Sequence, residues 1–242
     1  MEYLKVGTEL IAYEFHRSSK AKKVRITIKN ERVKVTVPAG LPLEYAKNFV
    51  EENKDWVLKH WQTQQAQAKK DLPKQYVAGE KFLYRGRNYP LVVEEISAPP
   101  YEAAFKGSRI VANIPPGLNS QEQSLLLKKL IKKWYLGQAN KLLPELLDYY
   151  SKLMDIPYQK LKVKDQKTRW GSCSSKGNIN LNWRIIMAPN PVTAYVIIHE
   201  LAHLKIMDHS KEFWTLVAKY LPDYKQCKKW LTENGKELLS YF

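Results

Sequence analysis

The chain of 242 residues has few cysteines and no long apolar run. Cys173 and Cys227 are its only cysteines, and they form no Cys-x-x-Cys pair. Two distant cysteines give no disulfide framework and fit a reducing compartment. No uninterrupted apolar stretch approaches the ~18 residues of a membrane-spanning helix, and the N-terminus has no secretory signal. We therefore expect a cytoplasmic protein with no membrane partner.

Acidic residues are scarce relative to basic ones. The chain carries 40 Lys and Arg against 24 Asp and Glu, which leaves a formal net charge of +16. The excess is gathered in three runs, at residues 17–29, 128–133 and 160–169. Because neutralised phosphates release counterions, such runs predict weak, non-specific binding to nucleic acid. Solubility, or a small anionic substrate, is the alternative explanation of the charge.

The first half of the chain has the alternating pattern that is typical of strands. Apolar and polar residues alternate at 24–29 and at 33–37, on either side of Asn30-Glu31, which predicts a hairpin. Apolar residues then recur at helical spacing from residue 43 to residue 61. A second hairpin at residues 103–114 leads through Pro115-Pro116-Gly117-Leu118, which matches Pro38-Ala39-Gly40-Leu41, into another helix. We interpret this as a weak internal repeat, with chance similarity as the alternative.

These patterns predict an α+β protein with two domains. Residues 1–118 would form a β-rich N-terminal domain with hairpins and one long helix. Residues 119–242 would form a mainly helical domain with a small sheet, since extended runs occur only at 161–164, 169–173 and 179–181. The boundary is expected near Leu118.

A cluster of histidines carries the chemistry. Three of the five histidines in the chain lie between His199 and His209. Asn190-Pro191 predicts the start of a helix, with Asn190 as its N-cap, and we expect this helix to run to about Ile206. His199 and His203 are then one turn apart on one face and can hold a single metal ion. Glu200 is adjacent to the first histidine and can reach a water molecule at the metal.

A zinc site with one open position needs a third protein ligand. His209 is six residues beyond His203, and a continuous helix would rotate it by ~240° out of reach. The chain must therefore leave the helix between Leu204 and Asp208, and Ser210 would begin the next helix. As alternatives to His209, the third ligand would be Asp208, Glu233 or Glu237.

Two segments resemble the YgjP-like metallopeptidase family, which is related to the SprT-like zinc proteases. The first is the sequence His-Glu-Leu-Ala-His-Leu-Lys-Ile-Met-Asp-His-Ser-Lys-Glu-Phe-Trp at 199–214. The second is Arg-Trp-Gly-Ser-Cys-Ser-Ser at 169–175, followed by Asn-Ile-Asn-Leu-Asn at 178–182. The resemblance implies a zincin-type catalytic domain with zinc as cofactor, His199, His203 and His209 as its ligands, and Glu200 as the catalytic base.

Metzincin proteases have the same histidine spacing but carry Gly at the position of Ile206, where it permits a sharp turn. The departure leaves the path from His203 to His209 open and favours the YgjP-like interpretation. Arg169 and Tyr195 are candidates for stabilising an oxyanion, although a solvated Arg and a packed Tyr are their ordinary roles. By analogy with zincins, the extended run at 169–173 is a candidate for aligning a substrate.

Three classes of function are consistent with these residues. The first is a zinc-dependent metallopeptidase that hydrolyses peptide bonds in a protein or peptide substrate. The second is a zinc-dependent hydrolase of a nucleotide or another phosphate-containing substrate, which would suit the basic charge. The third, a nucleic-acid-binding module with a structural metal, is the weakest, because structural zinc normally has four protein ligands and needs no adjacent glutamate.

Overall fold

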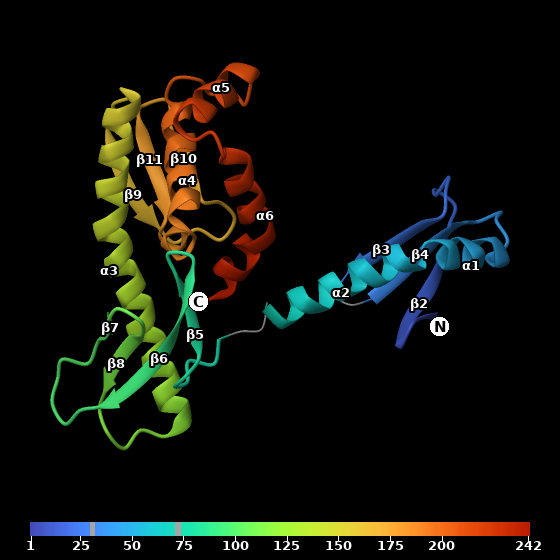
Figure 1. The fold of residues 1–242 in the computed structure, drawn as a ribbon, viewed down its shortest axis with the longest axis horizontal. Helices are drawn as coiled ribbons and strands as arrows, with labels where there is room; N and C mark the ends of the chain where they lie inside the picture. Colours follow the sequence, from blue (N-terminus) through green and yellow to red (C-terminus); the bar gives the residue numbers. More distant parts are fainter. Residues whose placement is uncertain (30–31, 71–73) are drawn as a thin grey trace. The chain divides into compact units, whose positions relative to one another are not determined.

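The computed structural model describes residues 1–29, 32–70 and 74–242. The chain is α+β and forms two compact units, Met1–Leu72 and Pro73–Phe242 (Figure 1). We call them the N-terminal unit and the C-terminal unit. The turn predicted at Asn30-Glu31 lies outside the described residues. No helix in the described part of the chain combines the length and apolar character that a membrane crossing requires.

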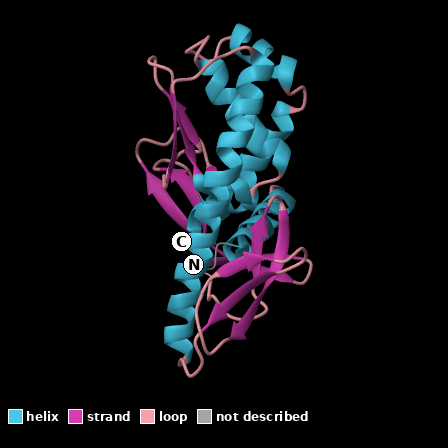
Figure 2. Ribbon diagram, turned by 90° about the vertical axis from the view of Figure 1, so that its left-hand side faces the viewer, coloured by secondary structure: helices cyan, strands magenta, loops and turns pink. Residues whose placement is uncertain are grey.

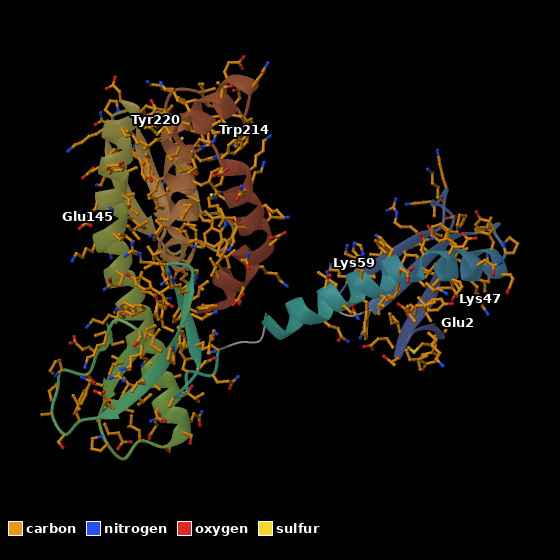
Figure 3. All side chains as sticks on the ribbon, viewed as in Figure 1. Glu2, Lys47, Lys59, Glu145, Trp214 and Tyr220 are labelled. Atoms are coloured by element: carbon orange, nitrogen blue, oxygen red, sulfur yellow. The ribbon has the colours of Figure 1, made fainter. Side chains whose placement is uncertain are left out.

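The N-terminal unit is a four-stranded sheet covered by helices. Its strands have the order β1-β2-β4-β3, in which only the β2–β4 pair is parallel. Their bounds are β1 Glu2–Val6, β2 Glu9–Ser18, β3 Arg25–Lys29 and β4 Arg32–Pro38. Val33, Val35 and Val37 of β4 alternate inward and are buried, as the pattern predicted. Lys47 of the first helix pairs with Glu2 of β1 at 3.2 Å (Figure 3).

The predicted single long helix of the N-terminal unit is in fact two helices. They are α1, Leu43–Glu52, and α2, Lys54–Lys70. Asn53 separates them, and its side-chain amide donates to the carbonyl of Phe49 at 2.8 Å. A side-chain bond of this kind competes with the backbone ladder of a helix, which accounts for the break.

The C-terminal unit begins with a second four-stranded sheet of the same topology. The order β5-β6-β8-β7 again has one parallel pair, β6–β8, between two antiparallel pairs. A Pro-x-Gly-Leu segment and a helix follow the last strand in both sheets. The shared topology supports the repeat that the sequence suggested. The bounds are β5 Lys81–Tyr84, β6 Arg87–Glu95, β7 Ala103–Phe105 and β8 Ile110–Ile114.

The rest of the C-terminal unit is a small sheet beside a group of helices (Figures 1 and 2). The three strands have the order β10-β11-β9, with β11 antiparallel to β10 and parallel to β9. They agree with the three extended runs expected from the sequence. The bounds are α3 Ser120–Met154, β9 Lys160–Lys164, β10 Gly171–Cys173, β11 Asn178–Asn182, η1 Trp183–Met187 (a 3₁₀ helix), α4 Asn190–His203, α5 Lys211–Tyr220 and α6 Tyr224–Ser240.

The division between the units differs from the predicted boundary near Leu118. The sheet β5–β8 belongs to the C-terminal unit because its apolar face continues into the core of that unit. Phe82, Leu91 and Ile110 of this sheet are buried in one cluster with Leu127 and Ile131 of α3. A sheet that buries its apolar face on a helix belongs to that helix's domain, whatever the composition of the chain on either side.

The tight turn between β5 and β6 contacts the start of α4. The backbone N–H groups of Arg85 and Gly86 donate to the carbonyls of Ile186 and Met187 at 3.0 and 2.8 Å. Both turn residues have positive φ, of 50° and 79°, and a Cβ on Gly86 would lie 2.8 Å from the side chain of Pro189. The first sheet of the C-terminal unit therefore holds the segment that leads into α4.

Candidate active site

Helix α4 carries the predicted metal-binding residues and is almost entirely buried. Its N-cap is Pro189, without a side-chain cap, so the predicted capping role of Asn190 is wrong. Asn190 instead lies in the first turn, where its Oδ1 accepts a hydrogen bond from Nε of Arg85 at 3.0 Å. The helix ends at His203, earlier than the predicted end at Ile206.

The structure brings His199, His203 and His209 together. The Nε2 atom of His199 lies 3.1 Å from Nε2 of His203 and 3.2 Å from Nε2 of His209. Two nitrogen ligands at ~2.05 Å from a tetrahedral zinc ion are about 3.3 Å apart. The three nitrogens therefore have the spacing of ligands around one small cation. Within the described residues, no other group of His, Cys, Asp or Glu meets the same geometric condition.

The chain reaches His209 by the sharp exit from α4 that the sequence required. The backbone N–H of Ile206 donates to Ala202 at 2.9 Å, and Ile206 is not among the residues with positive φ. This turn thus forms without the glycine of metzincins. The Nδ1 atom of His203 lies 3.1 Å from the carbonyl oxygen of Ile206. An Nδ1–H donated there leaves the lone pair on Nε2 of His203, which faces the other histidines.

The start of α5 fixes His209 from the other side. Ser210 is the N-cap of α5, as predicted, and its Oγ accepts from the backbone N–H of Phe213 at 3.4 Å. The ring of His209 stacks on that of Trp214, with centroids 5.5 Å apart. Neither Asp208, Glu233 nor Glu237, the alternatives for the third position, belongs to the histidine group.

The electrostatic environment favours the neutral forms of His199 and His203. Burial, together with the neighbouring His203 and His209, lowers the pKa of His199 to about 3. Burial also lowers the pKa of His203. A metal ion binds the neutral form of imidazole. His199 and His203 therefore need not lose a proton at neutral pH before they bind a metal ion. The buried Nδ1 of His199 has no hydrogen-bond partner among the described residues.

Glu200 is a buried carboxyl group in contact with β10. It is 6% exposed, and burial raises its pKa to about 7, although the charge of Arg169 acts in the opposite direction. A Cβ atom on Gly171 would lie 2.6 Å from Oε1 of Glu200 and 2.7 Å from its Cγ. Only glycine allows β10 to approach Glu200 this closely. The sequence placed Gly171 in a family signature but gave no reason for it.

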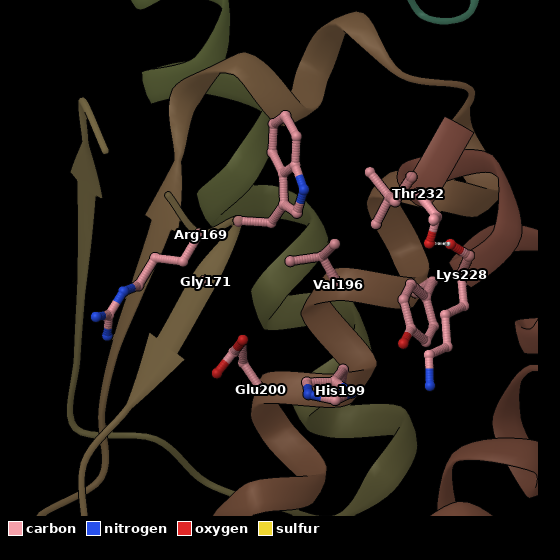
Figure 4. Close-up of a pocket in the computed structure, with 10 residues that line it drawn as sticks. Arg169, Gly171, Val196, His199, Glu200, Lys228 and Thr232 are labelled. Carbon is pink, nitrogen blue, oxygen red and sulfur yellow. Dashed lines mark hydrogen bonds between the residues drawn. The ribbon is translucent and has the colours of Figure 1, made fainter. Parts of the chain in front are cut away.

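A cleft of about 420 Å³ opens above Glu200 and His199 (Figure 4). Arg169 and Lys228 lie on opposite sides of these two residues in that view. Nζ of Lys228, in α6, is 4.8 Å from the ring centroid of Trp214. Tyr195, a candidate for oxyanion binding, also lines the cleft. Lys228 had no sequence signal, because α6 reaches the site only through the tertiary fold.

Comparison with known proteins identifies the family. The profile of the YgjP-like metallopeptidase domain matches residues 22–234. The chain belongs to the YgjP-like metallopeptidase family. Membership in this family implies a bound metal ion, and the three histidines form the group that can hold it.

Two individual proteins are similar to parts of this YgjP-like chain. A UTP pyrophosphatase of Escherichia coli (strain K12) is 32% identical over 71 residues, which cover 28% of the chain and 42% of the relative. The chain thus aligns with less than half the length of this curated relative. The crystal structure of the metallopeptidase zymogen of Pyrococcus abyssi abylysin is 26% identical, with 38% of this chain and 94% of that chain covered and a TM-score of 0.35.

Proposed function

We propose that this protein is a zinc-dependent metallopeptidase of the zincin type that hydrolyses peptide bonds in the cytoplasm. The observation that carries the proposal is the convergence of three imidazole groups, with Nε2 of His199 3.1 and 3.2 Å from Nε2 of His203 and His209, next in sequence to the buried carboxyl of Glu200. Family membership supports peptide hydrolysis. The two free cysteines support a reducing compartment.

Each residue has a distinct role in this proposal. His199, His203 and His209 hold the zinc ion, which when bound polarises the substrate carbonyl and acidifies water. Glu200 accepts the proton of the attacking water and passes it to the leaving amine. Burial raises the pKa of Tyr195 to about 12, so its hydroxyl stays protonated at neutral pH and can donate a hydrogen bond into the cleft.

Strand β10 is suited to guide an extended substrate. It lies at the end of the order β10-β11-β9, and no other described strand pairs with its second edge. Its residue Gly171 lies against Glu200. A peptide that adds to a sheet edge forms main-chain hydrogen bonds regardless of sequence, so addition to β10 would bring a peptide bond alongside the carboxylate.

The test is incubation of the zinc-loaded protein with a peptide library, with Glu200→Gln and His203→Ala as variants. Glu200→Gln should retain one zinc per chain and lose at least about a hundredfold in turnover, the usual size of a general-base effect. His203→Ala should lose most of its zinc by elemental analysis. His60→Ala is the matched control, because His60 stacks on Trp56 in the N-terminal unit. Near-normal turnover of Glu200→Gln would contradict the mechanism.

A second candidate function is hydrolysis of a nucleotide. It is supported by the partial similarity to a UTP pyrophosphatase and by two cations, Arg169 and Lys228, that line the cleft. The short coverage of that relative makes it secondary. A panel of nucleoside triphosphates, assayed beside the peptides and with the same variants, distinguishes the two. Release of pyrophosphate or phosphate that Glu200→Gln abolishes, without peptide cleavage, would replace the first proposal by the second.

A further inference from the structure

The segment that forms the three-stranded sheet is almost free of acids. Residues 156–199 include seven lysines and arginines and a single acid, Asp165. That carboxylate is already occupied, since it pairs with the buried Arg184 and, at 3.0 Å, with Lys132 of α3. The lysines of β9 are therefore not neutralised by any acid in their own segment.

The register of the sheet puts these lysines on one face with other polar groups. Lys160, Lys162 and Lys164 alternate along β9 and are all exposed. Lys160 and Lys162 are paired with Asn178 and Asn180 of β11, and Asn180 is paired with Ser172 of β10. The amide of Asn180 donates to Oγ of Ser172 at 3.1 Å, so both side chains are on the same face. We call the surface formed by Lys160, Lys162, Lys164, Asn178, Asn180 and Ser172 the β9 face.

The opposite face of the sheet is apolar and covered. Leu161 and Val163 of β9 are in register with Ile179 and Leu181 of β11, which are fully buried. This side packs on α3 and α4. Because paired residues of a sheet point to the same side, the polar residues must point away from that core. The alternation accordingly gives one packing face and one basic face.

We propose that the β9 face binds the phosphodiester backbone of nucleic acid without sequence preference. Alternate residues of a strand are about 6.6 Å apart, so the three lysines span roughly 13 Å. One strand of a duplex carries about four phosphates over that axial length. Amide and hydroxyl groups such as those of Asn180 and Ser172 are common donors to phosphate oxygens.

Further basic residues lie near the C-terminal end of β9. The ion pair of Lys132 with Asp165 joins the end of β9 to α3. Lys129 and Lys133 of the same helix are exposed. Arg169, the last residue of the basic run at 160–169, follows this end of β9 and lines the cleft. The third basic run is thus joined to the second by the ion pair of Lys132 with Asp165. Binding to this surface does not require hydrolysis.

The experiment measures binding of fluorescent duplex and single-stranded oligonucleotides over a range of salt concentrations. The variant is the triple substitution Lys160→Gln, Lys162→Gln, Lys164→Gln. At 50 mM salt its affinity should fall at least about tenfold, and the slope of log affinity against log salt for the duplex should fall by about 2 to 3. The matched control removes the same charge from exposed lysines elsewhere: Lys106→Gln, Lys141→Gln, Lys219→Gln. The control should stay within about twofold of the wild type.

Further arms make the result decisive. Replacement of the three β9 lysines by arginine should preserve binding, because the positive charge is kept. The zinc content of each variant shows whether it is folded. Equal losses in the glutamine triple variant and its control would overturn the proposal, because net charge alone would then explain binding. Absence of binding at low salt, or binding to anionic phospholipid vesicles but not to oligonucleotides, would also overturn it. Peptide hydrolysis is assayed separately, so failure of either proposal leaves the other standing.

Discussion

The contact between Gly171 and Glu200 shows how a residue without a side chain can determine the position of a neighbouring carboxyl group. Gly171 does not have a positive φ, so its backbone conformation is open to other residues. The restriction comes from space, since any Cβ would overlap Glu200. The carboxyl group thus rests against a bare stretch of main chain, which limits where it can move.

We expect Gly171→Ala to lower turnover by about 10- to 100-fold while zinc content stays the same. The added methyl group displaces the Glu200 side chain, and displacement of a catalytic group by about 1 Å can cost that much. The measurement is kcat on the best peptide of the library, beside metal analysis. Gly137→Ala is the control, because a Cβ there meets nothing within 4 Å and alanine suits the exposed face of α3. Full activity of Gly171→Ala would refute the positioning role.

For individual residues, the sequence predicted the grouping of the three histidines better than the contacts of the residues around them. The His-Glu-x-x-His spacing is local, because i and i+4 share a helix face whatever the rest of the fold does. The need for a third ligand then predicted the exit from α4. The contacts of Lys228 and Gly171 join segments far apart in the chain, and no local pattern encodes them. The cap of α4 was misassigned because Asn190 bonds to Arg85, a partner more than a hundred residues away.

Asp165 joins three elements of the C-terminal unit. It follows β9, accepts a hydrogen bond from Arg184 of η1, and pairs with Lys132 of α3. Arg184 is 3% exposed, so its charge depends on this partner. Partial burial alone would raise the pKa of Asp165, but the hydrogen bonds from Arg184 and Lys132 together lower it to about 2.

We expect Asp165→Asn to destabilise the C-terminal unit by about 1 to 2 kcal/mol at pH 7, since the buried guanidinium loses its counter-charge. For a domain of this size the melting temperature should fall by about 2 to 8 °C. The pKa of Asp165 is lower in the folded state than in the unfolded state, so its contribution is complete above about pH 4 and is lost as the pH falls towards 2. Thermal unfolding at pH 7, 4 and 3 should show the two melting temperatures converging. A constant difference would exclude the ion pair as the cause.

Elements with a clean pattern were predicted, and those with a mixed pattern were missed. Strands β9 and β11 alternate strictly, and Ser and Gly separate β10 from β11, so the positions of these strands followed from the sequence. Strands β1 and β2 were not predicted, because exposed apolar residues such as Tyr3 and Leu10 disturb the alternation. The break between α1 and α2 was missed because the apolar spacing continues across Asn53.

At the scale of the whole molecule, each unit has a core of its own. The cluster of the N-terminal unit includes Ile11, Val35 and Val50, whereas the C-terminal cluster extends from Tyr76 to Tyr241. The predicted boundary near Leu118 followed a change in composition, from strand-rich to helix-rich sequence. Composition does not report which sheet packs on which helix, and therefore it could not locate the division.

A fragment of residues 74–242 should fold cooperatively and bind about one zinc ion, because it includes the whole C-terminal core and all three histidines. Circular dichroism with heating, together with zinc titration, measures both properties. A fragment of residues 119–242 serves as the comparison. It lacks the sheet β5–β8 and the Arg85–Gly86 turn, so we expect it to unfold without a cooperative transition and to bind zinc weakly. Equal behaviour of the two fragments would mean that the first sheet is dispensable.

The repeated topology of the two four-stranded sheets has a consequence for the history of the chain. A duplicated module begins as two equal copies, but here the copies have unequal duties. In the second copy, Gly86 is fixed both by its φ and by its contact with Pro189. In the first copy, Gly7 lies in the corresponding turn, between β1 and β2, and also has a positive φ. Within its own unit, nothing lies within 4 Å of a Cβ added to Gly7. Substitutions should therefore accumulate faster in the turn of the first copy, while the turn of the second copy keeps its fit to the start of α4.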